Sequence, residues 1–524
     1  MKVMAPSLSD SFIEPTNKRD FSNILANSTG QIISILSSFI FLPIIIGAVG
    51  IEKYGLIAFF TMLFLVSNML DFGLTPALTR EISRRFRTRS ELVFLKEYIH
   101  AAEMVLFFAA SAIIAGFYFS SNWITVSWLS IDNLSVVEVK KCISVMGIVI
   151  ALRLYESAYR GVLIGFHNQV ILNVITSMGA ILRWGGAAAL LYLFDSSIFL
   201  FFVWQASISC LVTLALVIAI YFPLRSVKGN VFWSSDAFKV LWSFSGPMAV
   251  QALFIVLATQ MDKLILSKLL SLEDYGYYSI AAIFTSALIQ IAAPISQTYF
   301  ANLSESIGRN DIKKSKDYLD LSTQLAFSFV GPIALILCFF SYEVLLIWSS
   351  QAQLAAEVAP ILSLLSLSAL LAVITNPLYN LGLANGNVSI FLLINLIAML
   401  WFIPAMIFLV PSYGMIGAAF ILTMLNLFYF LIEIYIVFRI HPDYSRTNWL
   451  QGNLLLQLFT CITIALTFFL LKPEIDSLMA TLIYIGICFL LMLGAVISVS
   501  SKIRSIIINY LSARRFKKLD NSCL

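Results

Sequence analysis

The chain alternates long apolar runs with short polar stretches along its whole length. A helix that crosses a bilayer needs about 20 mostly apolar residues, and on this criterion we predict about fourteen such helices. They cover residues 21–49, 54–76, 92–119, 138–164, 168–194, 198–222, 238–268, 276–301, 318–347, 358–383, 387–410, 414–438, 449–471 and 477–500. The connections between them are too short to fold as separate domains. The pattern predicts an all-α integral membrane protein.

Composition agrees with this prediction and narrows the possible functions. The 524 residues are 60% hydrophobic and 12% charged, with a mean hydropathy of +0.92, whereas soluble domains are about 45–50% apolar and about 25% charged. The net charge of +5 is too small to favour a nucleic-acid partner. The six cysteines and three histidines are scattered, so we expect no disulfide framework, no metal site and no cofactor.

The basic residues collect in alternate loops. One side of the membrane holds the clusters around Lys18, from Arg80 to Lys96, from Arg309 to Lys316 and from Lys502 to Lys518. The other side holds few basic residues, namely Lys53, Lys140, Lys141, Lys268 and Lys472. Since Lys and Arg accumulate in cytoplasmic loops, we predict cytoplasmic tails at both termini, residues 1–20 and the basic segment 501–524. The first span is too long for a cleavable signal and should be retained as an anchor.

The sequence repeats itself weakly at an offset of about 220 residues. Glu52-Lys53-Tyr54-Gly55 corresponds to Glu273-Asp274-Tyr275-Gly276, and Trp128 corresponds to Trp348. An even number of spans separates the copies, so both copies enter the membrane in the same direction. We predict two parallel six-helix lobes, 21–222 and 238–440, followed by two further helices in 449–500. Transporters with such repeats bind substrate between the halves, although a channel or a scaffold could also be duplicated.

Several charged residues are predicted to lie within spans, where each costs at least about 2.5–3.5 kcal/mol at the bilayer centre unless it is paired or hydrated. Arg153, Glu156 and Arg160 share one helix face at i, i+3 and i+7, which leaves one positive charge over. Arg183 has no carboxylate at helical spacing, so its charge is expected to be unpaired within its own helix. Asp262 and Lys263 form an adjacent pair that is explained equally well by an interfacial position or by a functional role.

The surplus of positive charge inside the membrane predicts an anionic ligand, because arginine binds phosphate oxygens with a two-pronged fork. Glu343 and Glu433 fall near span ends, where an interfacial position explains them. Polar residues also follow one face of the first and fifth spans, including Asn23, Asn27 and Asn173. Such residues either line a water-filled cavity or join neighbouring helices by hydrogen bonds.

Motifs for chemistry are absent from the sequence. No Gly-x-x-x-x-Gly-Lys-Ser/Thr loop occurs and no soluble region could house a nucleotide-binding domain. The first outer loop offers Glu52 alone, whereas integral-membrane glycosyltransferases and polymerases need paired carboxylates or a large outer loop. We therefore expect no enzymatic activity and name no catalytic residues.

Short motifs resemble those of Wzx-type polysaccharide flippases in the polysaccharide transporter family, part of a MATE/MOP-like superfamily. The resemblance rests on Val49-Gly50-Ile51-Glu52-Lys53-Tyr54-Gly55-Leu56 and on Asp71-Phe72-Gly73-Leu74-Thr75-Pro76-Ala77-Leu78-Thr79-Arg80-Glu81-Ile82. Asp262-Lys263 before Ile265-Leu266-Ser267 and the stretch from Tyr159-Arg160-Gly161 to Gly165 are also similar to family patterns. The likeness covers the layout of the whole chain.

This resemblance implies two MATE-like lobes that open alternately to either side of a bacterial inner membrane. It implies that Arg153 and Arg183 line a cationic cavity for an undecaprenyl-diphosphate-linked oligosaccharide, with Arg80, Arg160 and Lys263 as further candidate substrate-binding residues. Membrane lipid is a second partner, and a polysaccharide polymerase and a chain-length regulator are candidate protein partners in O-antigen or related surface polysaccharide assembly. Twelve helices are usual for Wzx proteins, whereas fourteen resemble the lipid II flippase branch.

Coupling to an ion gradient would need a carboxylate, for which Glu156 and Asp262 are the candidates. Two other functions stay open from the sequence. The first is a cation-coupled multidrug exporter of MATE type, which would need acidic rather than basic residues in its cavity. The second is a membrane glycosyltransferase or polymerase. The preferred interpretation depends on guanidinium groups that face hydrated space between the lobes.

Overall fold

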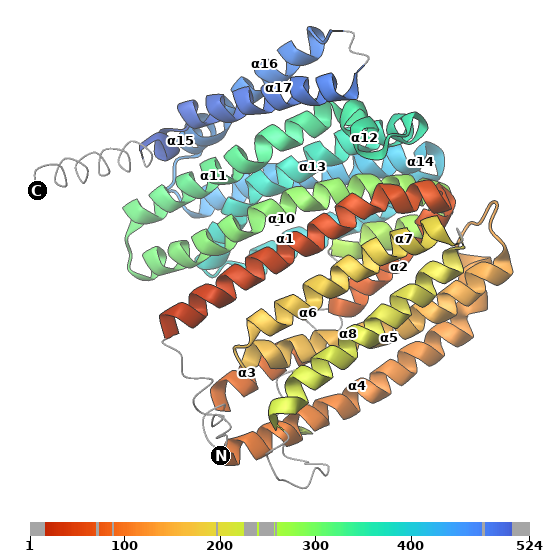
Figure 1. Cartoon of the computed structure of the whole chain (residues 1–524). Coiled ribbons are helices and arrows are strands. Elements are labelled where there is room, and N and C mark those ends of the chain that lie inside the picture. Colours follow the sequence, from red (N-terminus) through yellow and green to blue (C-terminus); the bar gives the residue numbers. More distant parts are fainter. Residues whose placement is uncertain are drawn as a thin grey trace, which may run out of the picture. The chain divides into compact units, whose positions relative to one another are not determined.

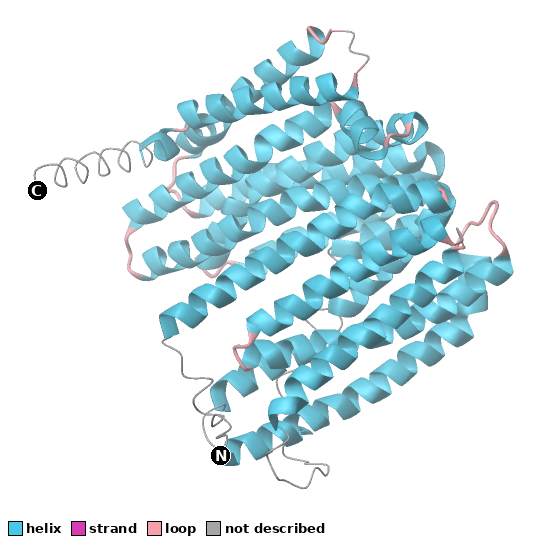
Figure 2. Cartoon of the chain, in the orientation of Figure 1, coloured by secondary structure: helices cyan, strands magenta, loops and turns pink. Residues whose placement is uncertain are grey.

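A computed structural model describes residues 16–69, 73–85, 89–194, 197–224, 238–239, 241, 256, 259–473 and 477–505. Nearly all of these residues are helical, and the described part of the chain contains no strand beyond a single bridge between Ser130 and Ser271 (Figure 2). The all-α fold class is confirmed. The chain divides into two compact units, unit 1 (Met1–Gly276) and unit 2 (Tyr277–Leu524), and each is described by itself.

Unit 1 begins with α1 (Thr16–Val49) and α2 (Ile51–Met69), which are separated by Gly50 at a φ of 82° (Figure 1). The helices that follow are α3 (Leu74–Arg85), α4 (Arg89–Trp123), the π-helical turn η1 (Ile124–Trp128), α5 (Val136–Gly165), α6 (Gln169–Ile181), the π-helical turn η2 (Leu182–Gly186), α7 (Ala187–Leu193) and α8 (Ile198–Leu224). Residues 259–269 form a further helical segment before α10 (Leu272–Gly308), whose first residues close the unit.

The centre of unit 1 is α5, which packs against α3, α4 and α8. Its apolar side chains fill the spaces between these helices, and Met146, Val149 and Ile150 are fully buried. On another side of the unit, α1 packs along α6 and α7, and Figure 1 shows α1 beside the single rod in which α7 continues α6. Arg153 and Glu156 on α5 are therefore largely enclosed by neighbouring helices.

Unit 2 comprises most of α10 followed by α11 (Ile312–Phe339), α12 (Ser341–Ser349), α13 (Ala352–Ala384), α14 (Val388–Ile440), α15 (Arg446–Leu450), the π-helical turn η3 (Gln451–Leu455), α16 (Leu456–Leu470) and α17 (Leu478–Val499). The long α14 is two helices joined at Gly414, whose φ of 57° and ψ of −145° are not helical. This break falls between the expected spans 387–410 and 414–438. The main contacts join α13 to α14 and α11 to α13, and α16 and α17 pack on α11.

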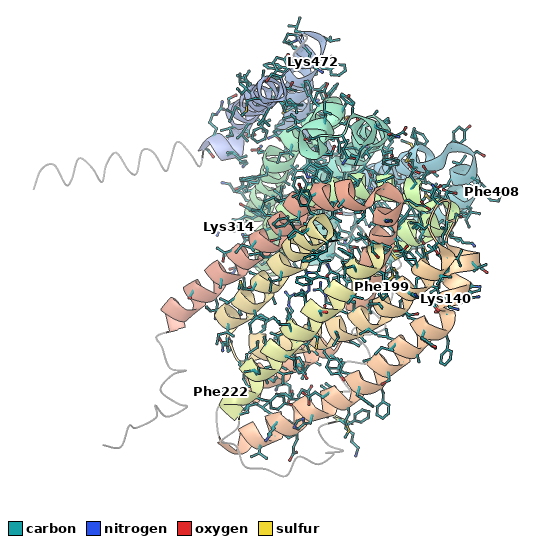
Figure 3. All side chains as sticks on the ribbon, turned by 45° about the vertical axis from the view of Figure 1, so that its right-hand side comes forward. Lys140, Phe199, Phe222, Lys314, Phe408 and Lys472 are labelled. Atoms are coloured by element: carbon teal, nitrogen blue, oxygen red, sulfur yellow. The ribbon has the colours of Figure 1, made fainter. Side chains whose placement is uncertain are left out.

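Ten helices in the described part of the chain are long and apolar enough to cross a membrane. Large apolar side chains are exposed along them, including Phe222 on α8 and Phe408 on α14, both marked in Figure 3. The protein is therefore a multi-pass membrane protein. The expected count of fourteen is not confirmed. Helices α2 and α5 occupy expected spans but are not among the ten, and α14 joins two expected spans into one helix. Most of the expected span 238–268 lies outside the described residues.

The expected span 54–76 was too long at its carboxyl end. Helix α2 ends at Met69, and the separate helix α3 begins at Leu74, just after Gly73 at a φ of 68°. Helix α3 buries Leu78 and Ile82 on one face and exposes Arg80 and Arg84 on the other. It is amphipathic because its sequence alternates apolar and basic residues at helical spacing.

Candidate functional site

An arginine–glutamate cluster lies between α5 and η2 inside unit 1. Arg183 Nη2 donates a 2.6 Å hydrogen bond to Glu156 Oε1, and both side chains are nearly inaccessible, with 6% and 7% of their surface exposed. Arg153 Nη1 lies 3.5 Å from Glu156 Oε2, on the side of the carboxylate that Arg183 leaves open. One carboxylate therefore holds two guanidinium groups from neighbouring helices.

The π-helical turn η2 places Arg183 beside α5. A π turn widens the helix by one residue and frees backbone carbonyls from their usual partners. Here α8 satisfies two of them: Trp204 Nε1 donates to the carbonyl of Leu182 at 2.9 Å, and Gln205 Nε2 donates to the carbonyl of Arg183 at 3.2 Å. A Cβ on Gly186 would lie only 2.5 Å from the Trp204 ring, so this glycine lets α8 approach the turn.

The cluster keeps a net positive charge, since two guanidinium groups share one carboxylate. Arg153 is 19% exposed, and its Cζ lies 4.7 Å from the centre of the Phe64 ring, a cation–π contact with α2. The Nε atoms of Arg153 and Arg183 are buried without a hydrogen-bond partner in the described residues. Arg160, two turns along α5, is exposed. The arrangement can attract an anion, and its most accessible donor within the cluster is Arg153.

The premise that the Arg183 guanidinium is left unneutralised is not met, because its counter-charge comes from another helix. Its partner is Glu156, 27 positions earlier on a different helix, and spacing within one helix could not reveal such a pair. The premise that guanidinium groups face hydrated space is likewise not met by Arg183, which is buried. The sequence correctly identified Arg153, Glu156 and Arg183 as unusual, and the structure brings these three together.

Two polar faces proposed from the sequence hydrogen-bond to each other. Asn173 Nδ2 on α6 donates to Asn27 Oδ1 on α1 at 2.6 Å, and Asn27 in turn bonds to Gln169. Asn23 Nδ2 donates to the carbonyl of His167 at 3.3 Å. These residues join α1 to α6, which favours the helix-joining interpretation over the cavity interpretation for this part of the two spans.

The other candidate residues lie outside the cluster. Arg80 is exposed on α3. Lys263, in the segment 259–269, is partly exposed and donates to Gln260 Oε1 at 3.4 Å. Asp262 is also partly exposed. The roles of Arg80, Lys263 and Asp262 therefore stay predictions.

The motif residues of α3 and α5 pack directly on one another. Thr75 Oγ1 and Ser157 Oγ are 3.0 Å apart, Thr79 Oγ1 donates to the carbonyl of Gly161 at 3.0 Å, and Ser83 Oγ donates to the carbonyl of Gly165 at 3.3 Å. Each step adds four residues on both helices, so α3 runs parallel to α5 in constant register. The motif that ends the second span therefore has a structural task, which is to dock α3 on the last turns of α5.

Sequence reasoning missed a polar cluster around Glu103 on α4. Glu103 Oε1 accepts hydrogen bonds from Tyr159 OH at 2.8 Å and Tyr221 OH at 2.9 Å, and Glu103 Oε2 lies 2.7 Å from His100 Nδ1. His100 and Glu103 lie three residues apart on α4, but the two tyrosines come from α5 and α8, so no sequence spacing connects the whole cluster. The only available signal was this polar pair within an expected span.

Comparison with known proteins decides the family. The model of the polysaccharide biosynthesis protein family matches residues 21–306, more than half of the chain, and the MatE model matches residues 247–408. The chain belongs to the polysaccharide biosynthesis protein family. A Shigella flexneri protein named for O-antigen transport is 22% identical over 401 residues, covering 76% of this chain and 92% of that protein. The resemblance to Wzx-type flippases of the MATE/MOP-like superfamily is confirmed at the family level.

Two solved structures share the fold of this chain. The lipid II flippase MurJ in an inward closed conformation is 14% identical, covers 91% of this chain and 98% of its own, and superposes with a TM-score of 0.69. An inward-facing multidrug resistance MATE transporter of the MOP superfamily is also 14% identical, covering 81% of this chain and 100% of its own at a TM-score of 0.62. At these identities the likeness establishes the MATE-like fold alone.

Proposed function

We propose that this protein, a transporter of the MATE/MOP-like superfamily, translocates undecaprenyl-diphosphate-linked oligosaccharide repeat units across the bacterial inner membrane. The product would be O-antigen or a related surface polysaccharide, and the mechanism would be alternating access of two lobes. Membership in the polysaccharide biosynthesis protein family supports the substrate class. The single structural observation that carries the proposal is the net positive Arg153–Glu156–Arg183 cluster within the spans of unit 1.

The chemistry of the cluster suits a lipid-linked diphosphate. A hydrated glycan cannot cross hydrocarbon, whereas its polyprenyl tail can stay in the bilayer. The diphosphate at the junction is the group that needs compensating charge, and arginine forks provide it. Arg153 would make the first contact with the diphosphate, because it is the more exposed of the two paired arginines. Further anion-binding candidates are Arg80, Arg160 and Lys263.

Transport would be driven by an ion gradient or by removal of the product outside. Glu156 and Asp262 are the carboxylates that we propose for coupling. A polysaccharide polymerase and a chain-length regulator are the proposed protein partners downstream. Cytoplasmic termini follow from the distribution of basic residues.

A second candidate is a cation-coupled multidrug exporter, which the MatE match over residues 247–408 favours. Such an exporter binds cations, and the basic cluster of unit 1 argues against it. Loss of the same arginines should reduce surface polysaccharide if the protein is a flippase. If the protein is an exporter, surface polysaccharide should stay normal and drug tolerance should be lost.

The test uses Arg153→Gln and Arg183→Lys in cells that lack the gene. Arg153→Gln leaves the Arg183–Glu156 pair in place, and Arg183→Lys keeps the charge but removes the fork. Loss of one charge-assisted hydrogen bond of about 1.5–3 kcal/mol weakens anion binding about 10- to 100-fold. We expect surface polysaccharide to fall in both variants while tolerance of cationic drugs is unchanged, at equal levels of membrane-inserted protein.

Arg309→Gln is the matched control, because Arg309 forms an exposed pair with Glu305 on the surface of unit 2 and should support normal polymer. Normal polymer from Arg153→Gln and Arg183→Lys would remove the anionic-ligand argument. Lost drug tolerance with normal polymer would favour the exporter. Incorporation of sugar from a sugar nucleotide by purified protein would instead indicate a glycosyltransferase or polymerase.

A further inference from the structure

Glu433 is a buried acidic residue in the second half of α14, and nothing in the described part of the chain compensates it. Only 5% of its surface is exposed. Its Oε2 has no hydrogen-bond partner, and no ion pair joins the carboxyl to a basic residue in the described ranges. A position near the end of a span, as expected from the sequence, does not by itself account for Glu433, since the side chain is enclosed by protein.

Three other buried or half-buried carboxyl groups have partners that compensate their charge. Glu156 is bonded to Arg183, Glu343 pairs with Lys472, and Glu52 accepts backbone hydrogen bonds from Asp132 and Asn133. Each of these carboxyls therefore has a charged or hydrogen-bonding partner. Glu433 lacks this compensation, and an isolated carboxylate in an apolar interior neutralises by taking up a proton rather than staying ionised.

Among the described residues, the titratable groups found near Glu433 are phenols and not bases. The phenols of Tyr379 on α13 and Tyr429 on α14 are the titratable groups close enough to interact with it electrostatically. Arg439, further along α14, is exposed and donates to Tyr435 OH at 2.6 Å. Arg446 on α15 is exposed as well. The nearest guanidinium groups in sequence are thus directed to the surface.

The position of Glu433 gives a proton a short route to water. It lies seven residues before the end of α14 at Ile440, which corresponds to about 10 Å along a helix. A modest separation of α14 from α13, its main packing partner, would hydrate the carboxyl. Burial and hydration would then favour opposite protonation states of the same group.

We propose that Glu433 is a proton-binding site of unit 2. The carboxyl holds a proton on one oxygen in the conformation described here. When water reaches it, the O–H bond breaks, one proton passes to water and a carboxylate is left, with no electron transfer. This site is independent of the anion site proposed in unit 1, and its existence does not depend on the substrate.

Infrared difference spectroscopy on the full-length protein in lipid nanodiscs tests the proposal, because a protonated carboxylic acid has a carbonyl stretch that a carboxylate lacks. We compare wild type, Glu433→Gln and the matched control Glu343→Gln at neutral pH. The protonated-carboxyl band should be present in wild type, shift in D₂O, disappear in Glu433→Gln and persist in Glu343→Gln. Absence of the band in wild type, or its persistence in Glu433→Gln, overturns the proposal.

A second variant guards against misfolding of Glu433→Gln. Glu433→Asp keeps the carboxyl but moves it by one methylene, so the band should be retained at a shifted frequency. An unshifted band in Glu433→Asp would assign the proton to another residue and would overturn the proposal equally. Neither readout involves polysaccharide export, so failure here leaves the anion-site proposal standing, and failure of the export test leaves this one standing.

Discussion

Gly55 on α2 lies directly against the backbone carbonyl of Leu272, at the first residue of α10. A Cβ added to Gly55 would be 1.8 Å from that oxygen, and a Cβ added to Gly276 would be 2.9 Å from the carbonyl oxygen of Ile51. Gly55 and Gly276 occupy corresponding places in the predicted internal repeat. The two Tyr-Gly pairs therefore approach each other through backbone, within unit 1.

We predict that Gly55→Ala destabilises the protein by about 1–3 kcal/mol, because the new methyl group forces α2 and Leu272 apart. The thermal unfolding temperature of purified protein in detergent checks this. Gly116→Ala is the matched control, since nothing lies within 4 Å of a Cβ at that helical position and alanine is a better helix former than glycine by about 1 kcal/mol. Equal unfolding temperatures for the two variants would contradict the close packing.

We predict that Glu156→Gln costs about 3–5 kcal/mol, because it leaves the buried Arg183 guanidinium without its counter-charge. The double variant Glu156→Gln/Arg183→Met should recover part of the loss, since it removes the uncompensated charge as well. Denaturation of wild type, Glu156→Gln, Arg183→Met and the double variant gives the coupling energy between positions 156 and 183. The exposed Arg309–Glu305 pair provides the comparison: Glu305→Gln should change stability by at most about 1 kcal/mol. Additive effects at positions 156 and 183 would refute the pairing.

Asn453 ties η3 to α11. It accepts from Gln324 Nε2 at 2.7 Å, and its Nδ2 donates to Asp320 Oδ1 at 2.6 Å. Asn453→Ala leaves both partners short of a hydrogen bond, at about 1–3 kcal/mol for each buried group. We expect faster amide exchange over 446–470 without a change in unit 1. Thr460→Val, which removes a hydroxyl bonded within its own helix to Leu456, should leave exchange at η3 unaltered.

The loop after α14 should loosen as the pH falls. Burial lowers the pKa of His441, while Asp443 acts in the opposite direction, and Asn387 Nδ2 donates to His441 Nε2 at 2.9 Å, which requires a neutral ring. The folded-state pKa of His441 lies below the ordinary histidine value. Above the ordinary value the imidazole is neutral in both the folded and the unfolded chain, so burying it does not lower the free energy of unfolding. As the pH drops past the ordinary value, the unfolded chain binds the proton first and stability falls until the folded-state pKa is reached.

Amide exchange around Asn387 and His441 measures this effect between about pH 7.5 and about pH 5.5, the range in which histidine titrates. Exchange rates should first be corrected for their intrinsic pH dependence. We expect protection to decrease at the lower pH in wild type and to stay constant in His441→Gln, which cannot become charged. The same loss of protection in both proteins would rule out His441 as the cause.

Most of the fold could be predicted because hydropathy is a local property. In a bilayer each span must be apolar along its own length and must satisfy its own backbone hydrogen bonds, so 92–119, 198–222 and 358–383 can be recognised one at a time as α4, α8 and α13. Boundaries set by backbone conformation were less predictable. Gly73 takes a positive φ just before α3 begins, and Gly414 produced a break without a polar loop.

The candidate site was only half predictable. The sequence identified Arg153, Glu156 and Arg183 as charges in apolar surroundings, because the cost of such a charge depends on its immediate neighbours. Their pairing depends on the distance between helices, which η2 sets by turning Arg183 toward α5. The docking of Thr79 on Gly161 is of the same kind, since a hydroxyl and a carbonyl far apart in sequence met only through packing.

The sequence alone determined that this chain is a helical membrane protein with a surplus of buried arginine, because span length, charge and composition are carried by consecutive residues. The tertiary structure decided which of those charges are neutralised. Helix packing supplied Arg183 with Glu156 and, within the described ranges, left Oε2 of Glu433 without a hydrogen-bond partner. The physical reason is that electrostatic compensation depends on atoms within a few ångströms of each other, and only the packed helices fix those distances.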